Sequence, residues 1–489
     1  MNIVNLFDQL QLFLTTLDKG WSLCTIPFMV TFIVFFAIYL FVNRTRRTAM
    51  MVYVVAFSLF FAYKANGILM LLLPMTALLS WALTELMKKT QGWQRKLWLT
   101  IIILLDLTPL LYYKYANFLL TSINAIFTTN FSLLEIFLPI GISFYTFQAI
   151  SYSIDVYRQK FTMKTGLLEY FFYLTFFPLL MAGPITRAEV LIPQLKEKTC
   201  GDKELVYGGL WLVIVGLLKK GLIADYIAQY NNWIFDDPTS YSGFENLMGV
   251  FGYTLQIYCD FSGYSDMSIG IAAILGFKLK ENFNFPYQSL NLTEFWRRWH
   301  IALSTWFRDY VYIPLGGNRK GTFRTDINCF LTMLVSGLWH GASWMFVIWG
   351  AVHGLGLVIH KAYKPWLDYI PNIFPVRFVA WLITFTYVSV AWIFFRASSL
   401  ENAFTLINQI ATDFSWDYLV PFVKARPVWT VFVVLGLGFH AIRQQFCQWL
   451  QRLFICTPWI LKLVIFLIVI QIIINFRQEN VQPFIYAQF

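Results

Sequence analysis

Apolar residues occur along most of the chain in stretches long enough, or nearly so, to cross about 30 Å of membrane hydrocarbon. Shorter apolar stretches near 116–128, 138–150 and 264–277 are typical of re-entrant or interfacial helices. We therefore expect an all-α integral membrane protein with about eleven spanning helices and several partial ones. The long stretches lie near 26–43, 49–64, 67–87, 97–113, 166–183, 205–223, 244–260, 328–340, 342–360, 377–395, 428–446 and 459–476.

Composition excludes the soluble classes of protein. Of 489 residues, 58% are hydrophobic and only 13% are charged, whereas soluble domains carry roughly 25% charged residues. The net charge of +11 belongs in a membrane protein to cytoplasmic loops and does not indicate nucleic acid. Basic loops at 44–47 and 88–96 predict a cytoplasmic location for both and an external N-terminus. Because no basic segment precedes the first apolar run, we expect no cleaved signal at the N-terminus.

The strongest candidate for chemistry is His340, which joins two apolar runs in the sequence Gly337-Leu338-Trp339-His340-Gly341. An ionisable side chain inside a membrane protein is costly, so it indicates function. The flanking glycines allow a close backbone approach or a helix break. Imidazole suits removal of a proton from a hydroxyl or thiol. The alternative is a core histidine that is satisfied by a backbone carbonyl.

A second histidine, His300, lies in the polar stretch 280–328. Around it the spacing of Trp296, Trp299, Leu303 and Trp306 predicts one amphipathic helix with an aromatic face. His300 is a candidate for a second polar wall of the site. Three arginines of this stretch either bind phosphate groups of a lipid or an activated donor, or only anchor the helix at the membrane interface. They are Arg297, Arg298 and Arg308.

The other histidines are weaker candidates. His353 and His360 lie seven residues apart and so share a helix face, and His353 is a candidate for lining the cavity. His440, near the end of an apolar run, is typical of an interfacial residue. No further ligands have metal-site spacing, so no metal site is expected.

Two carboxylates, Asp260 and Asp266, flank Tyr264 beside the apolar run 247–257. Buried carboxylates need partners, and two interpretations stay open. They pair with an arginine of 297–308 or orient a histidine, or else Asp260 or Ser262 caps a helix that begins near Tyr264. The segment 312–321, with Asn318 in Pro314-Leu315-Gly316-Gly317-Asn318-Arg319, is a loop by its turn residues. It lacks the spacing of a phosphate-binding P-loop.

Taken together, these motifs resemble the membrane-bound O-acyltransferase (MBOAT) family, in its bacterial branch that includes the alginate O-acetyltransferase. The resemblance runs from about 138 to 360. It divides one membrane domain into N-terminal helices 1–137, a catalytic core 138–360 and C-terminal helices 361–489. The motifs that carry it, in chain order, are Met181-Ala182-Gly183-Pro184-Ile185, Asp260-Phe261-Ser262-Gly263-Tyr264-Ser265-Asp266, Asn282-Phe283-Asn284-Phe285-Pro286-Tyr287, Phe295-Trp296-Arg297-Arg298-Trp299-His300, Arg308-Asp309-Tyr310, the loop with Asn318, and Gly337-Leu338-Trp339-His340-Gly341.

The resemblance implies that His340 is catalytic and that His300 is the second important residue, with Trp339 among the candidate cavity residues. It implies a helical bundle around a tunnel in the cytoplasmic (inner) membrane, with no bound cofactor. The acyl donor would be acetyl-CoA, and a separate SGNH-type envelope protein would pass the acetyl group to a cell-envelope polysaccharide. The alternatives are D-alanyl transfer to teichoic acid from a carrier protein, a transporter without chemistry, and a structural scaffold.

Overall fold

The computed structural model describes residues 21–197, 202–367 and 369–476. Most of the first 25 residues, on which the expectation about a signal rests, lie outside them. By their contacts the described residues form two compact units. Unit 1 contains those of Met1–Tyr113, Glu135–Met181 and Arg187–Cys200, and unit 2 those of Lys114–Leu134, Ala182–Thr186 and Gly201–Phe489. This division differs from the three-part division expected above, which stays a prediction.

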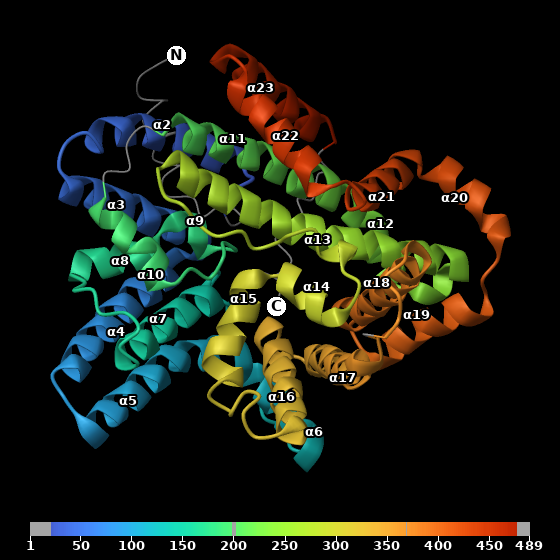
Figure 1. Ribbon diagram of the computed structural model, residues 1–489, viewed down its shortest axis with the longest axis horizontal. Coiled ribbons are helices and arrows are strands. Elements are labelled where there is room, and N and C mark those ends of the chain that lie inside the picture. Colours follow the sequence, from blue (N-terminus) through green and yellow to red (C-terminus); the bar gives the residue numbers. More distant parts are fainter. Residues whose placement is uncertain (1–20, 198–201, 368, 477–489) are drawn as a thin grey trace. The chain divides into compact units, whose positions relative to one another are not determined.

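Unit 1 is built from helices joined by short turns (Figure 1). The predicted span 166–183 is broken at Phe176, where an extended residue precedes Pro178 and separates α8 from α9. A buried carboxyl, Asp106, accepts a hydrogen bond from Ser80 Oγ (3.2 Å). The helices are α2 (Ile26–Val42), α3 (Arg47–Asn66), η1 (Gly67–Leu71), α4 (Leu72–Lys88), α5 (Gly92–Leu110), α7 (Ile142–Tyr157), α8 (Leu167–Thr175), α9 (Phe177–Leu180), α10 (Ala188–Leu191) and η3 (Pro193–Lys196); the π-helical turn η2 (Leu111–Tyr115) leads into unit 2.

Unit 2 contains two closely packed helix pairs, α11 with α13 and α16 with α17 (Figure 1). Its helices are α6 (Ala116–Phe127), α11 (Lys203–Leu217), the π-helical η4 (Leu218–Ala224), α12 (Asp225–Asp236), η5 (Pro238–Ser240), α13 (Gly243–Ile274), η6 (Pro286–Gln288), α14 (Leu292–Arg298), α15 (Ile301–Phe307), the π-helical η7 (Arg308–Tyr312), α16 (Thr322–His340), α17 (Trp344–Leu367), α18 (Phe374–Arg396), α19 (Leu400–Thr412), η8 (Trp416–Tyr418), α20 (Leu419–Ala425), α21 (Pro427–Phe439), α22 (Gln444–Cys456) and α23 (Trp459–Phe476).

The expected all-α membrane architecture is confirmed, because the described residues contain no strand and several helices of membrane length. Six helical segments in the described part are long and apolar enough to span, or seven if a bent pair is one span. This number is smaller than the eleven predicted, because some apolar runs join into one helical segment, as in Arg47–Lys88, and because the run 166–183 is broken into two short helices. The six are Arg47–Lys88, Gly92–Phe127, Lys203–Asp236, Trp344–Trp366, Phe374–Arg396 and Trp459–Phe476.

Helices α11 and α13 meet along a glycine seam, formed by Gly209 and Gly216 of α11 facing Gly270 and Gly263 of α13. At each of the four positions an added Cβ would lie 2.5–2.8 Å from a backbone carbonyl oxygen of the facing helix. Only glycine permits two backbones to approach this closely. The seam therefore fixes α13, the helix that carries the predicted carboxylates.

Candidate active site

His340 is the last residue of α16, and its neighbouring glycines explain why the helix ends there. A Cβ added to Gly337 would lie 2.2 Å from the Phe346 carbonyl oxygen, and a Cβ added to Gly341 would lie 2.0 Å from the Phe346 ring. Gly341 is extended, which terminates α16 and lets the start of α17 pack directly against it. The expected close approach and helix break are therefore confirmed.

The imidazole of His340 is buried in a wall of aromatic rings. Its centroid lies 5.0 Å from that of Trp339, 4.9 Å from Trp349 and 5.5 Å from Phe395, and the residue is only 2% exposed. Burial of this kind disfavours the charged form of an imidazole. The ring is therefore placed to act as a neutral proton acceptor.

His300 lies in a backbone turn between α14 and α15, with a positive φ of 43°. The single amphipathic helix predicted over this stretch is therefore wrong. The turn depends on residues distant in sequence, because the Ile301 N–H donates to the Asn282 carbonyl (2.9 Å) and the Asn284 N–H donates to the Arg298 carbonyl (2.9 Å). These bonds satisfy backbone groups that a continuous helix would pair internally.

Asn282 determines which nitrogen of His300 carries the proton. Its Oδ1 accepts from the Ala302 N–H (3.1 Å) and lies 3.1 Å from His300 Nδ1, and its Nδ2 donates to Ser265 Oγ of α13 (3.1 Å). Since the Ala302 N–H can only donate, the amide oxygen is correctly identified, and His300 Nδ1 must be the donor. Nε2 of His300 is then the basic nitrogen, and it has no hydrogen-bond partner among the described residues. Burial lowers the pKa of His300 to about 3, so the ring is neutral.

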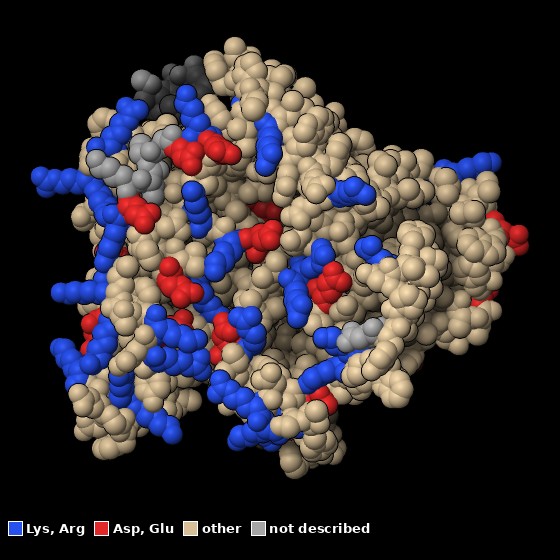
Figure 2. Space-filling model, in the orientation of Figure 1, with Lys and Arg blue, Asp and Glu red and all other residues tan. Residues whose placement is uncertain are grey.

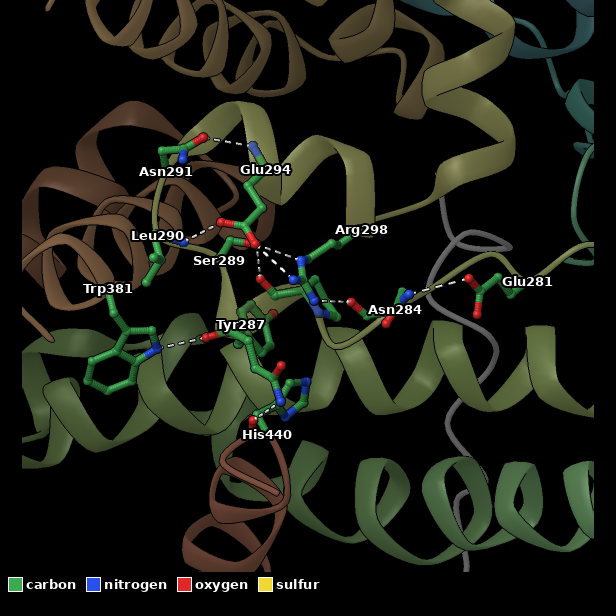
Figure 3. Close-up of polar contacts among 12 residues, drawn as sticks. Glu281, Asn284, Tyr287, Ser289, Leu290, Asn291, Glu294, Arg298, Trp381 and His440 are labelled. Carbon is green, nitrogen blue, oxygen red and sulfur yellow. Dashed lines mark hydrogen bonds and ion pairs between the residues drawn. The ribbon is translucent and has the colours of Figure 1, made fainter. Parts of the chain in front are cut away.

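A polar network holds the segment before His300 in place (Figure 3). Glu294 accepts from the Leu290 N–H (2.9 Å) and pairs with Arg298 (2.8 Å), which also donates to the Asn284 carbonyl (3.3 Å). Asn291 Oδ1 caps α14 by accepting from the Glu294 N–H (2.9 Å). Arg298 is thus a structural member of this network.

The two candidate histidines meet at one indole. The Trp339 ring centroid lies 6.2 Å from His300 and 5.0 Å from His340. On the other side of His340 the Trp349 ring lies 4.8 Å from that of His353, which lies 5.1 Å from Trp296. His353 is fully buried, and neither of its ring nitrogens has a hydrogen-bond partner in the described part of the chain. The two histidine motifs, around His300 and His340, therefore meet in one aromatic cluster that also contains His353.

A cavity of about 1100 Å³ opens beside this cluster and is lined by residues of α14 to α18 and their connections. Its lining includes Trp296 and Ser336, which lies one helical turn before His340 on α16, but not His340 itself. Five cationic side chains line it against one carboxylate, Glu294. In Figure 2 Lys and Arg side chains gather over this region. The five are Arg297, Arg308, Lys361, Lys364 and Arg377.

The carboxylates Asp260 and Asp266 lie in the middle of α13, so the helix-cap interpretation is wrong. Their partners are two consecutive lysines of the π-helical turn η4, and not the predicted arginines. Lys219 Nζ lies 2.7 Å from Asp266, and Lys220 forms ion pairs with Asp260 and, at 2.8 Å, with Asp225. The lysines belong to the apolar run 205–223. Their charge within that run is the only feature of the sequence that could have indicated a role for them. These pairs join η4 to α12 and α13.

The remaining predicted residues lie in different surroundings. Tyr264 is buried beneath Lys220, whose Nζ lies 5.8 Å from the ring centroid. Asn318 is exposed in its loop, which is confirmed as a loop, and does not line the cavity. His360 does line it and shares a hydrogen bond with Thr293 (3.0 Å). His440 is buried against Tyr258 (centroids 4.5 Å apart), and its predicted position at the membrane interface stays a prediction.

Sequence reasoning missed Asn282, although it begins one of the quoted motifs, because its role depends on three hydrogen bonds to distant residues. Among the described residues, no group of three or more His, Cys, Asp or Glu side chains is arranged to hold a metal ion.

The fold and the site define a multi-pass membrane protein with two neutral, buried histidines beside a basic cavity. The family model of the membrane-bound O-acyltransferases (MBOAT) matches residues 163–403. A probable alginate O-acetylase of Pseudomonas aeruginosa is 42% identical over 74% of this chain and 70% of its own length. The chain belongs to the membrane-bound O-acyltransferase family.

Two other relatives extend this comparison. A peptidoglycan O-acetyltransferase of Helicobacter pylori is 39% identical over 64% of each chain. A teichoic acid D-alanyltransferase of Bacillus subtilis is 27% identical over 54% of this chain and 70% of its own length. The chain thus spans about two thirds of the length of the curated relatives it matches.

Proposed function

We propose that this protein is an O-acetyltransferase of the inner membrane that moves an acetyl group from acetyl-CoA towards a cell-envelope polysaccharide. The observation that carries the proposal is the neutral His340 at the end of α16, one helical turn beyond the lining of a large basic cavity. The relatives that transfer acetyl groups are also more similar to this chain than the relative that transfers D-alanine. This favours acetyl over D-alanyl transfer.

In the proposed step, His340 takes the proton of an acceptor hydroxyl while the hydroxyl oxygen attacks the thioester carbonyl. The new C–O ester bond forms, the C–S bond breaks, and the departing thiolate of CoA receives a proton. A positioned base of this kind typically contributes about 10²–10⁴-fold in rate. His300, with its Nδ1 proton held by Asn282, presents its Nε2 as a second acceptor in the same cluster.

The cavity suits the donor of this reaction. Its volume of about 1100 Å³ lies just above the usual range for small-molecule sites, which is about 300–1,000 Å³. Its five cations match the phosphates of a nucleotide thioester, because guanidinium and ammonium groups form charge-assisted hydrogen bonds with phosphate oxygens. The acceptor would be an SGNH-type envelope protein that passes the acetyl group to the polysaccharide.

The test is acetyl transfer by membranes that contain the full chain or its His340→Gln variant. Radiolabelled acetyl-CoA is supplied, and the ester-linked acetate recovered from the envelope polysaccharide is measured. We expect His340→Gln to lower kcat by at least about 100-fold. The matched control is His440→Gln, which removes a buried imidazole away from the cavity and should keep activity once normalised to folded protein.

Two results would contradict the proposal. One is full activity of His340→Gln. The other is label transfer from a D-alanyl carrier protein but none from acetyl-CoA.

A further inference from the structure

The end of α16 is held by two residues that no motif predicted, Lys114 and Tyr115, which end the π-helical turn η2 (Leu111–Tyr115). Lys114 Nζ donates to the carbonyl oxygens of Trp339 (2.7 Å) and His340 (3.0 Å), and Tyr115 Oη donates to that of Leu338 (2.9 Å). The ammonium also lies 5.8 Å from the centroid of the Trp339 ring. Three consecutive carbonyls at the end of one helix are therefore bound by two consecutive side chains.

These carbonyls are the ones that a helix cannot satisfy itself, because the last four C=O groups of an α-helix have no intrahelical partner. Inside a membrane, water does not replace the missing donors. The C-terminal end of the helix also carries partial negative charge, which a cation stabilises. A lysine within the apolar run 92–127 thus has a physical reason to lie at the end of α16.

We infer that Lys114 is a positioning residue for acyl transfer, which holds the helix end so that the His340 ring keeps its place in the aromatic cluster. This inference rests on the proposed function. His340 ends α16 and Gly341 is extended, so no further helical turn fixes the orientation of the imidazole. The Lys114 ammonium supplies that constraint on the backbone of His340, and Tyr115 supports it one residue earlier.

The chain offers a matched control in Lys462. It is also buried, and its Nζ donates to the carbonyls of Ile455 (3.0 Å) and Thr457 at the end of α22. Its ammonium lies 4.0 Å from the Tyr207 ring centroid. Lys462→Met therefore removes the same kind of helix-end contact without touching either candidate histidine.

The experiment compares Lys114→Met, Lys114→Arg and Lys462→Met in the acetyl-CoA transfer assay, with kcat normalised to the folded fraction measured by size-exclusion chromatography. Misplacement of a reacting group by about 1 Å can cost about 100-fold. We expect Lys114→Met to lose about that factor in kcat, with KM for acetyl-CoA changed by less than about twofold. Lys114→Arg, which keeps the cationic N–H donors, should recover at least about a tenth of the wild-type kcat. The control Lys462→Met should have the wild-type kcat.

If Lys114→Met yields too little folded protein, Tyr115→Phe serves instead, because it removes a single hydrogen bond and should lower kcat about fivefold. The inference is overturned if the folded Lys114→Met or Tyr115→Phe protein has wild-type kcat, or if Lys114→Arg is as inactive as Lys114→Met. Failure of the proposed function looks different. In that case the wild type transfers no more label than His340→Gln, whatever residue stands at position 114.

Discussion

Removal of the charge of Lys220 should destabilise the protein more than removal of the charge of the adjacent Lys219. The Lys220 side chain is 1% exposed and pairs with Asp260, 5% exposed, and with Asp225, 20% exposed. Lys220→Met keeps the aliphatic chain but leaves two carboxylates without their cation. Breaking a buried pair from one side typically costs about 3–5 kcal/mol, because the remaining charge stays desolvated.

The adjacent residue provides the comparison. Among the described residues Lys219 pairs with one carboxylate, Asp266, and their side chains are 23% and 21% exposed. Partial exposure screens the charge that is left behind, so Lys219→Met should cost about 1 kcal/mol. The difference of about 2–4 kcal/mol corresponds to roughly 30- to 1000-fold in the unfolding equilibrium.

The assay is an SDS titration of the purified protein in mixed micelles, which reports the free energy of unfolding. A second variant tests the cause, since Asp260→Asn in the Lys220→Met background removes one of the two carboxylates that have lost the Lys220 cation. The double variant should be more stable than Lys220→Met alone, which is a non-additive result. Equal losses for the two lysine variants, or further destabilisation by Asp260→Asn, would refute the reasoning.

Two further predictions follow from the site. Gly337→Ala places a Cβ 2.2 Å from the Phe346 carbonyl oxygen and should lower the free energy of unfolding by about 1–3 kcal/mol. Gly438→Ala is the control, because nothing lies within 4 Å of its added Cβ, and it should not lower Tm. Thermal unfolding of both variants checks this, and equal changes in Tm would contradict the packing argument. The pKa of His300 is lowered from 6.5 to about 3 in the folded protein, so the unfolded chain binds the proton first and the stability due to the neutral ring is lost as pH falls from about 6.5 towards 3. The Tm of His300→Gln should therefore fall less than the Tm of the wild type between pH 7 and pH 5. An equal fall in both proteins would show that His300 does not contribute to the pH dependence of stability.

The features that could be predicted from the sequence are those set by local chemistry. Gly337 and Gly341 around His340 indicated a close backbone approach, and the loop 312–321 followed from its turn residues. The left-handed backbone at His300 was not predictable in this way, because Asn282 stabilises it from a distant part of the chain. The partners of Asp260 were missed for the same reason, since a charge pair between helices depends on how the helices cross.

The glycine seam has a consequence for the site. Because its four glycines touch the facing backbone, a shift of α11 by one turn would drive a side chain such as Val213 into α13. The two helices therefore have a single permitted register. Ser265, two residues after Gly263 on α13, accepts a hydrogen bond from Asn282, whose Oδ1 in turn lies against His300 Nδ1. The position of the His300 imidazole therefore depends on the backbone contact between α11 and α13. A change of side-chain rotamer does not move that contact.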